Sequence, residues 1–249
     1  MSANAPMNVE KALQFRVMGD WGHFRRIDTN TVKQTYRVIP RTTIAGMIGA
    51  ILGRSRDSYY DEFAPEKTGI AISVDVPIQT RRMAMLELTS TSDETTTRNG
   101  HKMYRRNKTG TENRQQRLSE YLVDPSYTVT VATTQDTLHA DLREALEAGQ
   151  SVYTPCLGKT ECLASIDFIG EDTLSKTRTK TVDTVAPTSL VEASGPIGVE
   201  RTPRHFNLTD EGRTPSGFVS YAYNMEAEEM MLVEETEAFA VNDQAVLFV

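Results

Sequence analysis

The stretch that most constrains the fold is residues 13–54, which begins LQFRVMGDWGHFRR and ends YRVIPRTTIAGMIGAILGR. Leu13, Phe15 and Val17 alternate with other side chains, which is the two-residue period of a half-buried strand. The GDWG that follows breaks this pattern and predicts a tight turn. The segment therefore predicts a strand, a turn and a connection that leads into a helix.

The helix is predicted over about residues 41–52. Pro40 can start it because the missing N–H of proline would have no partner in the first turn. Behind it, apolar side chains recur at helical spacing, namely Ile44, Met47, Ile48, Ile51 and Leu52. Gly46 and Gly49 each cost about 1 kcal/mol relative to alanine in a helix. Close packing of this helix on a sheet is the expected compensation.

Four arginines flank the connection between this strand and this helix: Arg25, Arg26, Arg37 and Arg41. A guanidinium group binds phosphate through two parallel hydrogen bonds and stays charged at physiological pH. The cluster therefore predicts a phosphate-binding surface at the first crossover of the fold.

Charge is distributed unevenly along the chain. The formal net charge is −7, yet residues 1–120 carry 19 Lys and Arg against 13 Asp and Glu, and residues 121–249 carry 8 against 21. A basic half beside an acidic half is expected where one face meets a polyanion and negative charge keeps the rest soluble. The acidic, lysine-poor composition also suggests a salt-adapted host, where bidentate arginine contacts survive screening better than point charges.

Composition and motifs exclude several classes of protein. The apolar run in the predicted helix is shorter than the ~20 residues needed to span a bilayer, and the N-terminus lacks a signal-peptide core, so we expect a cytoplasmic protein. Two cysteines cannot form a disulfide framework or a four-ligand zinc site. The four histidines lack metal-ligand spacing, so no metal or cofactor is expected. LGKT at residues 157–160 ends like a P-loop, but Tyr153 stands where a glycine is required, which excludes nucleotide hydrolysis.

Residues 90–117 have almost no apolar side chains and cannot supply a core. Asn99-Gly100 is a strong signal for a two-residue hairpin turn. One acid, Glu112, accompanies a set of cations in the second half of this segment: Arg98, Lys102, Arg105, Arg106, Lys108, Arg114 and Arg117. We predict a projecting basic hairpin or loop. Two interpretations remain open, an RNA-binding surface and a solvated insertion without a partner.

The rest of the chain predicts an α+β fold. Strands are expected at residues 70–77, 81–89, 118–123, 127–133 and 166–169, and a helix at 138–148. Without the insertion, this order matches a βαββαβ ferredoxin-like layer. Residues 172–194 are threonine-rich and predict a linker or loop. Short strands then predict a small β-rich C-terminal region, at residues 196–200, 218–225, 231–234 and 245–249.

The candidate chemistry in the basic insertion is metal-free RNA cleavage. His101 and Lys102, with a nearby tyrosine, could supply a general base, an electrostatic stabiliser and an acid for attack by a ribose 2′-hydroxyl. One histidine in a basic loop more commonly contacts phosphate or solvent. Binding without cleavage is therefore the favoured hypothesis.

Three sequence blocks carry a family resemblance: GDWGHFRR (residues 19–26), IPRTTIAGMIGAILG (39–53) and YTPCLGKTECLA (153–164). Together they resemble the fifth CRISPR-associated protein family of the RAMP superfamily, in its subtype I-B form, from a salt-adapted archaeon. In this family the protein caps the 5′ end of the guide RNA in a Cascade surveillance complex. The resemblance implies a ferredoxin-like RAMP domain over residues 1–171, a thumb hairpin at about 90–117, and a linker with a small β-rich region over 172–249.

The resemblance also implies a non-catalytic subunit beside a backbone subunit, a large subunit and a separate repeat-processing nuclease. The implied contacts to the 5′ handle of the CRISPR RNA are Arg25, Arg26, Arg37, Arg41, His101, Lys102, Arg105, Arg106, Lys108 and Lys159. In another subtype the homologue cleaves the repeat with a Tyr, Lys and His set. Tyr59, Tyr60, His101 and Lys102 do not align clearly with that set, and a metal-independent endoribonuclease remains the alternative.

Replacing Arg105 and Arg106 together by alanine tests the basic insertion. If both side chains contact handle phosphates, the double variant binds handle RNA more weakly, and the slope of log affinity against log salt falls by about 1 per lost contact. Titrations at several salt concentrations measure this slope. An unchanged slope would count against the assignment of the insertion as an RNA-binding thumb.

Overall fold

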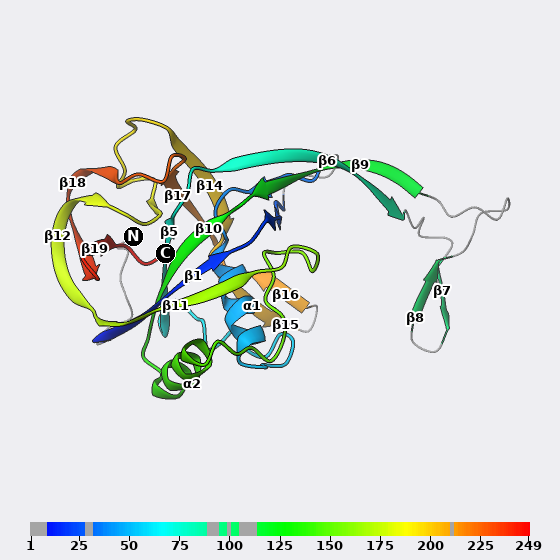
Figure 1. The fold of residues 1–249 in the computed structure, drawn as a ribbon, viewed down its shortest axis with the longest axis horizontal. Coiled ribbons are helices and arrows are strands. Elements are labelled where there is room, and N and C mark those ends of the chain that lie inside the picture. The colour runs from blue at the N-terminus through cyan, green and yellow to red at the C-terminus, as the bar shows by residue number, and fades with distance from the viewer. Residues whose placement is uncertain (1–8, 28–31, 89–94, 99–100, 105–113, 210–211) are drawn as a thin grey trace.

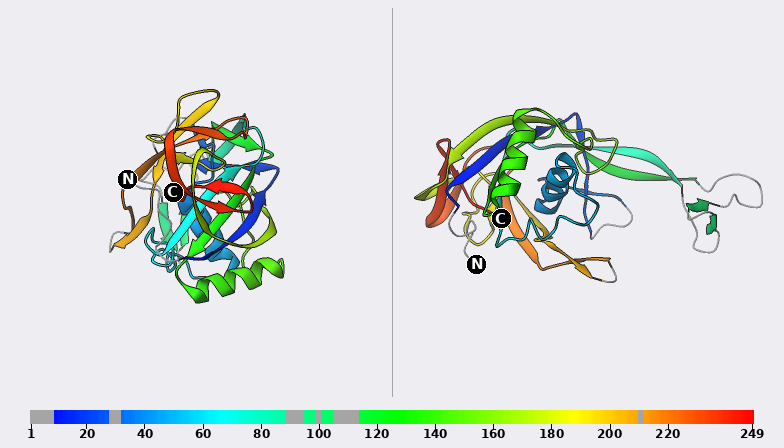
Figure 2. Two further views of the ribbon diagram at one scale, coloured as in Figure 1. Left: turned by 90° about the vertical axis from the view of Figure 1, so that its left-hand side faces the viewer. Right: turned by 90° about the horizontal axis from the view of Figure 1, so that it is seen from below.

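The computed structural model describes residues 9–27, 32–88, 95–98, 101–104, 114–209 and 212–249 (Figure 1). Within these residues the chain is rich in strands and contains two α-helices. Packed sheets form a body, and one long hairpin extends away from it (Figures 1 and 2). This architecture agrees with the predicted α+β class.

The central sheet has four antiparallel strands in the order β11-β1-β10-β5. These strands are β1 (Lys11–Met18), β5 (Thr68–Val74), β10 (Ser126–Thr133) and β11 (Ser165–Thr173). Each lies where the apolar alternation predicted a strand, although β11 is longer at both ends than predicted. β1 and β10 are the two inner strands, so their side chains form the middle of the core.

Two helices occupy the connections of this sheet. α1 (Arg41–Ile51) precedes β5, and α2 (Asp136–Glu147) joins β10 to β11. α1 begins directly after Pro40, as the sequence predicted. A tyrosine from the following loop explains two of its glycines, because a Cβ at Gly46 or Gly49 would lie 3.1 or 3.0 Å from Tyr59. The glycines of α1 thus allow close packing of the Tyr59 ring on the helix, rather than the predicted packing on a sheet.

Both faces of the central sheet are covered at one end. Leu13 and Phe15 on β1 pack in the main core with the apolar side chains of both helices. On the opposite face, Ala12 packs with Val246 and Phe248 from the end of the chain. β1 is therefore more deeply buried than the predicted half-buried strand, because the C-terminal segment covers its second face.

The long hairpin pairs β6 (Gln79–Leu88) with β9 (Arg114–Val123), from Gln79 opposite Val123 to Leu88 opposite Arg114. Near the body, β9 also pairs with β2 (Trp21–Gly22). A second small hairpin pairs β7 (Thr95–Arg98) with β8 (His101–Tyr104), as the Asn99-Gly100 turn signal predicted. Arg105, Arg106 and Lys108 lie outside the described residues, so their predicted role stays a prediction.

The C-terminal region contains two three-stranded sheets and a hairpin. One sheet has the order β12-β18-β19, with β12 (Ser175–Val182), β18 (Met230–Val241) and β19 (Gln244–Val246). The other has the order β13-β17-β14, with β13 (Ala186–Pro187), β14 (Ile197–Pro203) and β17 (Phe218–Asn224). The hairpin consists of β15 (Phe206–Thr209) and β16 (Gly212–Pro215).

The predicted linker over residues 172–194 is wrong for residues 175–182, which form β12. This strand is polar because most of its side chains are exposed or only partly buried, and its threonines are β-branched residues that favour extended backbone. β18 supplies its hydrogen-bonding partner from 48 to 65 residues further along the chain. Polar composition alone does not distinguish such a strand from a linker.

The C-terminal region and the central sheet are joined by backbone hydrogen bonds. The amide of Val185 donates to the carbonyl of Ile72 at 2.8 Å, and the amide of Val249 donates to that of Ile70 at 3.0 Å. Tyr221 and Tyr223 of β17 belong to the main core. The predicted boundary after residue 171 falls inside β11.

A tight loop at residues 156–163 packs on the first turn of the chain. The amide of Leu157 donates to Cys162 O at 2.7 Å, and the amide of His23 donates to Leu157 O at 2.9 Å. Gly158 has φ of +90°, and a Cβ there would overlap the carbonyl oxygen of His23. Only glycine fits this contact.

Substitution of this glycine should therefore destabilise the fold strongly. Gly158→Ala combines left-handed backbone with steric overlap, and we expect a loss of about 3 kcal/mol or more in the free energy of unfolding. Gly149→Ala is the matched control, since Gly149 has φ of +61° and no atom within 4 Å of its Cβ. The control should lose only about 1–2 kcal/mol. Urea denaturation measures both, and equal losses would contradict the packing described.

Candidate nucleic-acid interface

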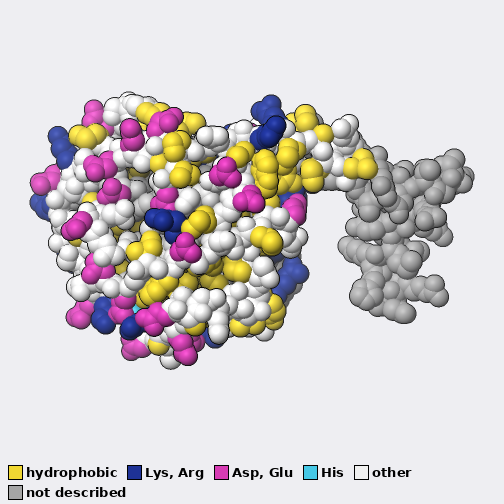
Figure 3. Space-filling model, in the orientation of Figure 1, with side chains coloured by type: hydrophobic (Ala, Val, Ile, Leu, Met, Phe, Trp, Pro, Cys, Tyr) yellow, Lys and Arg dark blue, Asp and Glu magenta, His cyan; other side chains and the backbone are white. Residues whose placement is uncertain are grey.

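A pocket of about 430 Å³ lies between the first turn of the chain, the start of α1 and the start of β15. Its cations are Arg25, Lys33 and Lys159. Aromatic rings from three parts of the chain also line it: Phe24, Tyr36 and Phe206. We name this site the basic pocket. Figure 3 shows Lys and Arg side chains at the base of the long hairpin and on the edge of the body beneath it, and further Lys, Arg, Asp and Glu side chains spread over the body.

Two short strands position one wall of the basic pocket. β3 (Phe24–Arg25) pairs with β4 (Thr35–Tyr36), which sets Phe24 opposite Tyr36 and Arg25 opposite Thr35. Lys33 is fixed against β9 by two backbone hydrogen bonds, from its amide to Leu118 O at 3.1 Å and from the amide of Glu120 to its carbonyl at 2.9 Å. The wall is thus attached to the base of the long hairpin.

Lys159 forms the opposite wall. Its Nζ donates to the Tyr121 hydroxyl at 2.8 Å, lies 4.9 Å from the centre of the Tyr121 ring and is 3.5 Å from the carboxylate of Glu161. Burial lowers the pKa of Lys159, but the hydrogen bond to Tyr121 and the charge of Glu161 outweigh this and raise it. Lys159 therefore stays charged while it faces the pocket.

Arg25 and Arg26 differ in their surroundings. Arg25 is exposed at the pocket and makes no ion pair with a residue that the structure describes. Arg26 is partly buried, and its guanidinium lies 5.6 Å from the centre of the Tyr36 ring. Arg25 is thus the arginine of the predicted cluster that is best placed to receive a phosphate.

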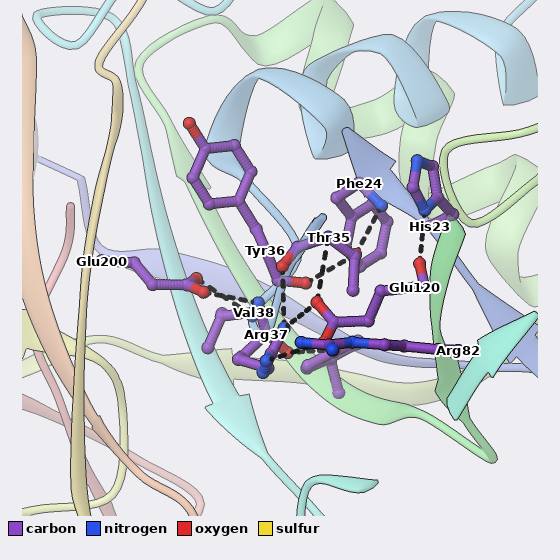
Figure 4. Close-up of polar contacts among 10 residues, drawn as sticks. His23, Phe24, Thr35, Tyr36, Arg37, Val38, Arg82, Glu120 and Glu200 are labelled. Carbon is purple, nitrogen blue, oxygen red and sulfur yellow. Dashed lines mark hydrogen bonds and ion pairs between the residues drawn. The ribbon is translucent and has the colours of Figure 1, made fainter. Parts of the chain in front are cut away.

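Arg37 is committed to an internal network (Figure 4). Its Nη1 and Nη2 atoms donate to the two carboxylate oxygens of Glu120 at 2.8 and 3.3 Å, and Nη1 also donates to Thr35 O at 2.9 Å. Glu120 is 5% exposed. The structure therefore places Arg37 in a largely buried ion pair rather than on the predicted phosphate-binding surface.

Arg41 is also inside the protein. Its side chain is 4% exposed, and Nη2 donates to Thr68 O at 2.6 Å. Burial lowers the pKa of Arg41 to about 10, with a further contribution from the charge of Arg204. The predicted phosphate contact at Arg41 does not lie on the accessible surface, because the first turn of α1 directs this residue toward β5.

His23 is a buried residue that lines the basic pocket. It is 1% exposed, and its Nδ1 lies 2.6 Å from the carbonyl oxygen of Glu120. Because a carbonyl only accepts, Nδ1 carries the hydrogen. Burial lowers the pKa of His23, with Lys159 and Lys33 acting in the same direction against the hydrogen bond to Glu120, so the ring is neutral near pH 7.

The structure leaves part of the predicted site undescribed and adds residues to it. His101 and Lys102 lie on β8, and the structure does not describe their side chains. Sequence reasoning missed Lys33, Tyr36 and Phe206. Lys33 and Tyr36 were detectable as a cation and an aromatic ring within the basic connection, but no local signal links Phe206 to it.

The arrangement can bind a phosphate chain with unstacked bases. No acidic side chain occupies the first turn of α1, so the positive end of the helix dipole adds to the three cations of the pocket. Phe206 is the partly exposed ring of the pocket and can stack a base, whereas Phe24 and Tyr36 are 2% and 4% exposed and only form its wall. Among the described residues, no His, Cys, Asp and Glu cluster could hold a metal ion, and no helix has the length and hydropathy of a membrane span.

Several solved structures share this fold. A CRISPR protein from Archaeoglobus fulgidus is similar over 96% of this chain and 99% of its own, with a TM-score of 0.55 and 12% identity. A chain of a CRISPR RNA-guided surveillance complex is similar over 92% of this chain and 91% of its own, with a TM-score of 0.54 and 16% identity. At such identities the likeness concerns the fold.

The family follows from the sequence itself. Residues 12–225 match the family model described as CRISPR-associated protein (Cas_Cas5). The chain belongs to this Cas5 family, which confirms the family predicted from the three sequence blocks. No curated protein matches the chain.

Replacement of Arg37 tests its role as the ion-pair partner of Glu120. Arg37→Met leaves the carboxylate of Glu120 buried without its main partner, and we expect a loss of about 3–5 kcal/mol in the free energy of unfolding. Arg143→Met is the control, because Arg143 is 47% exposed and pairs on the surface with Glu147 and Glu171. It should lose less than about 1 kcal/mol. Unchanged stability of Arg37→Met, with weaker RNA binding, would instead make Arg37 an RNA contact.

Proposed function

We propose that this chain is a non-catalytic CRISPR RNA-binding subunit of a type I-B Cascade complex and holds the 5′ handle of the guide RNA in antiviral defence. The observation that carries the proposal is the basic pocket, where Arg25, Lys33 and Lys159 meet the start of α1 in a chain of the Cas5 family. Single-stranded RNA suits this site because its bases can leave the stack and meet the partly exposed ring of Phe206. One similar structure is described as part of a CRISPR RNA-guided surveillance complex.

We infer a ferredoxin-like RAMP body from the central sheet. Counted along the chain, its strands have the spatial order 4-1-3-2, since β11-β1-β10-β5 is the observed arrangement. All three pairings are antiparallel, and each helix lies in one of the two connections expected for a βαββαβ unit. This order supports the ferredoxin-like interpretation of the sequence.

We infer that the long hairpin acts as the thumb. β9 runs from the wall of the basic pocket into the hairpin, so RNA held at Lys33 lies beside the hairpin base. Arg81 and Arg82 on β6 are exposed there, and Arg82 is 4.0 Å from the carboxylate of Glu120. RNA contacts at His101, Lys102, Arg105, Arg106 and Lys108 further along this insertion remain part of the proposal.

The proposed partners are the 5′ handle of the CRISPR RNA, a Cascade backbone subunit and a large subunit, in the cytoplasm of a salt-adapted archaeon. The excess of arginine over lysine supports contacts that survive high salt. The acidic half, residues 121–249, supplies Lys159 and Phe206 to the basic pocket, and the rest of it would face solvent or protein rather than RNA.

A metal-independent endoribonuclease is the second candidate, and one observation favours it. The structure brings a histidine, a tyrosine and a lysine together, because the His23 and Tyr121 rings are 5.2 Å apart and Lys159 binds the Tyr121 hydroxyl. However, His23 and Tyr121 are 1% and 2% exposed, which denies a ribose access to their polar atoms. The geometry therefore supports binding better than cleavage.

Incubation of the purified protein with labelled repeat RNA in the presence of a chelator tests the two candidates. We expect tight binding and intact RNA. Arg25→Ala and Lys159→Met should each weaken binding about tenfold, because a hydrogen bond to a charged group contributes about 1.5–3 kcal/mol. Arg178→Ala is the control, since Arg178 is an exposed arginine on β12.

Two results would replace the proposal. RNA cleavage that disappears in His23→Ala or His101→Ala would make the chain a nuclease. Affinity that is equal in Arg25→Ala, Lys159→Met and Arg178→Ala would remove the basic pocket as the binding site.

A further inference from the structure

One buried carboxylate from the C-terminal region reaches the segment that forms the basic pocket. Glu200 lies on β14 and is 3% exposed. Its two carboxylate oxygens accept hydrogen bonds from the backbone amides of Arg37 at 2.7 Å and Val38 at 3.4 Å (Figure 4). These two residues connect β4, which carries Tyr36 of the pocket, to Pro40 at the start of α1.

The chemistry of this contact requires a carboxylate. Two successive amides point to one side chain, and an ionised carboxylate offers two acceptor oxygens without a donor. On the other side of the same segment, the Tyr127 hydroxyl donates to Arg37 O at 2.7 Å. The connection is thus held through its donors by β14 and through its acceptor by β10.

Ionisation of Glu200 does not stabilise the fold. Burial raises the pKa of Glu200 to about 7, against the hydrogen bonds from Arg37 and Val38 and the charges of Arg37 and Arg26. The Arg37 guanidinium is bound to Glu120 instead. The other titratable groups that interact with Glu200 are hydroxyls, which carry no positive charge. They belong to Tyr127 on β10 and to Tyr221 and Tyr223 on β17.

We propose that Glu200 is a positioning residue of the basic pocket, which holds the β4–α1 connection in its RNA-binding geometry through the amides of Arg37 and Val38. This inference rests on the proposed RNA-binding function. When Glu200 is protonated, one oxygen becomes a donor and can no longer serve Val38 as an equal acceptor. The β4–α1 connection is then held less firmly, and RNA should bind more weakly.

The pH dependence of stability has the opposite sign from that of binding. The pKa of Glu200 is raised from 4.5 to about 7 in the fold, so ionisation is less favourable in the folded state than in the unfolded state. The contribution of Glu200 to stability is greatest below pH 4.5 and is lost as pH rises to about 7. Neutralisation of Glu200 should therefore leave stability equal or higher in either role, but only the loss of a positioning carboxylate also weakens RNA binding.

Glu200→Gln separates these roles. At pH 8 we expect the variant to bind handle RNA about tenfold more weakly than the wild type, while its free energy of unfolding is equal or higher. At pH 5.5 the affinities of the two proteins should converge, because Glu200 of the wild type is then protonated. Glu234→Gln is the control, since Glu234 is an exposed glutamate on β18, and it should follow the wild type at both pH values.

Hydrogen exchange at the Arg37 and Val38 amides gives a second measurement on the wild type alone. We expect their protection to rise between pH 6 and 8, after correction for intrinsic exchange, together with RNA affinity. Titrating cations would produce the reverse trend, since their protonation strengthens RNA binding as pH falls. Equal affinity of Glu200→Gln and wild type at pH 8, or protection that does not change, would overturn the positioning role. Absence of wild-type RNA binding at every pH would instead overturn the proposed function.

Discussion

The structure depends on the way the segment between β4 and α1 is tied to the rest of the chain. Arg37 supplies the charge that compensates the buried carboxylate of Glu120 on β9. Its backbone amide donates a hydrogen bond to the carboxylate of Glu200 on β14. A buried ion pair adds little net stability against an apolar replacement, but loss of one partner is costly. Its effect here is to fix three distant parts of the chain in one arrangement, next to Tyr36 of the basic pocket.

This arrangement explains how an anionic protein can present a cationic site. Lys159 remains charged beside Tyr121 and Glu161. Arg25 is left exposed, while Arg37 is partly buried in its ion pair with Glu120 and Arg41 is buried. The pocket is attached to β9, which continues into the long hairpin (Figure 1). A polyanion bound at the pocket would therefore run directly onto the hairpin base, in keeping with the Cas5 family to which the chain belongs.

Much of the fold was accessible to local reasoning. β1, α1, β5, β10 and α2 all follow hydrophobic periods and terminal signals that depend only on neighbouring residues. β12 was missed because its threonine-rich sequence has no apolar face of its own, and only its pairing with β18 makes it a strand. The depth of burial of β1 was missed for a related reason, since the strands that cover its second face come from the end of the chain.

The sequence by itself determined the main strands and helices, the excess of cations around the first crossover and the family of the protein, because these follow from residue types at short spacing. Tertiary structure alone decided which cations line the basic pocket. Arg25 and Arg41 are both arginines of one cluster, yet one is exposed and the other buried, since the direction of a side chain depends on the packing of α1 against β5. The roles of Phe206 and Glu200 were likewise undetermined until folding brought them more than 160 residues back to the first crossover.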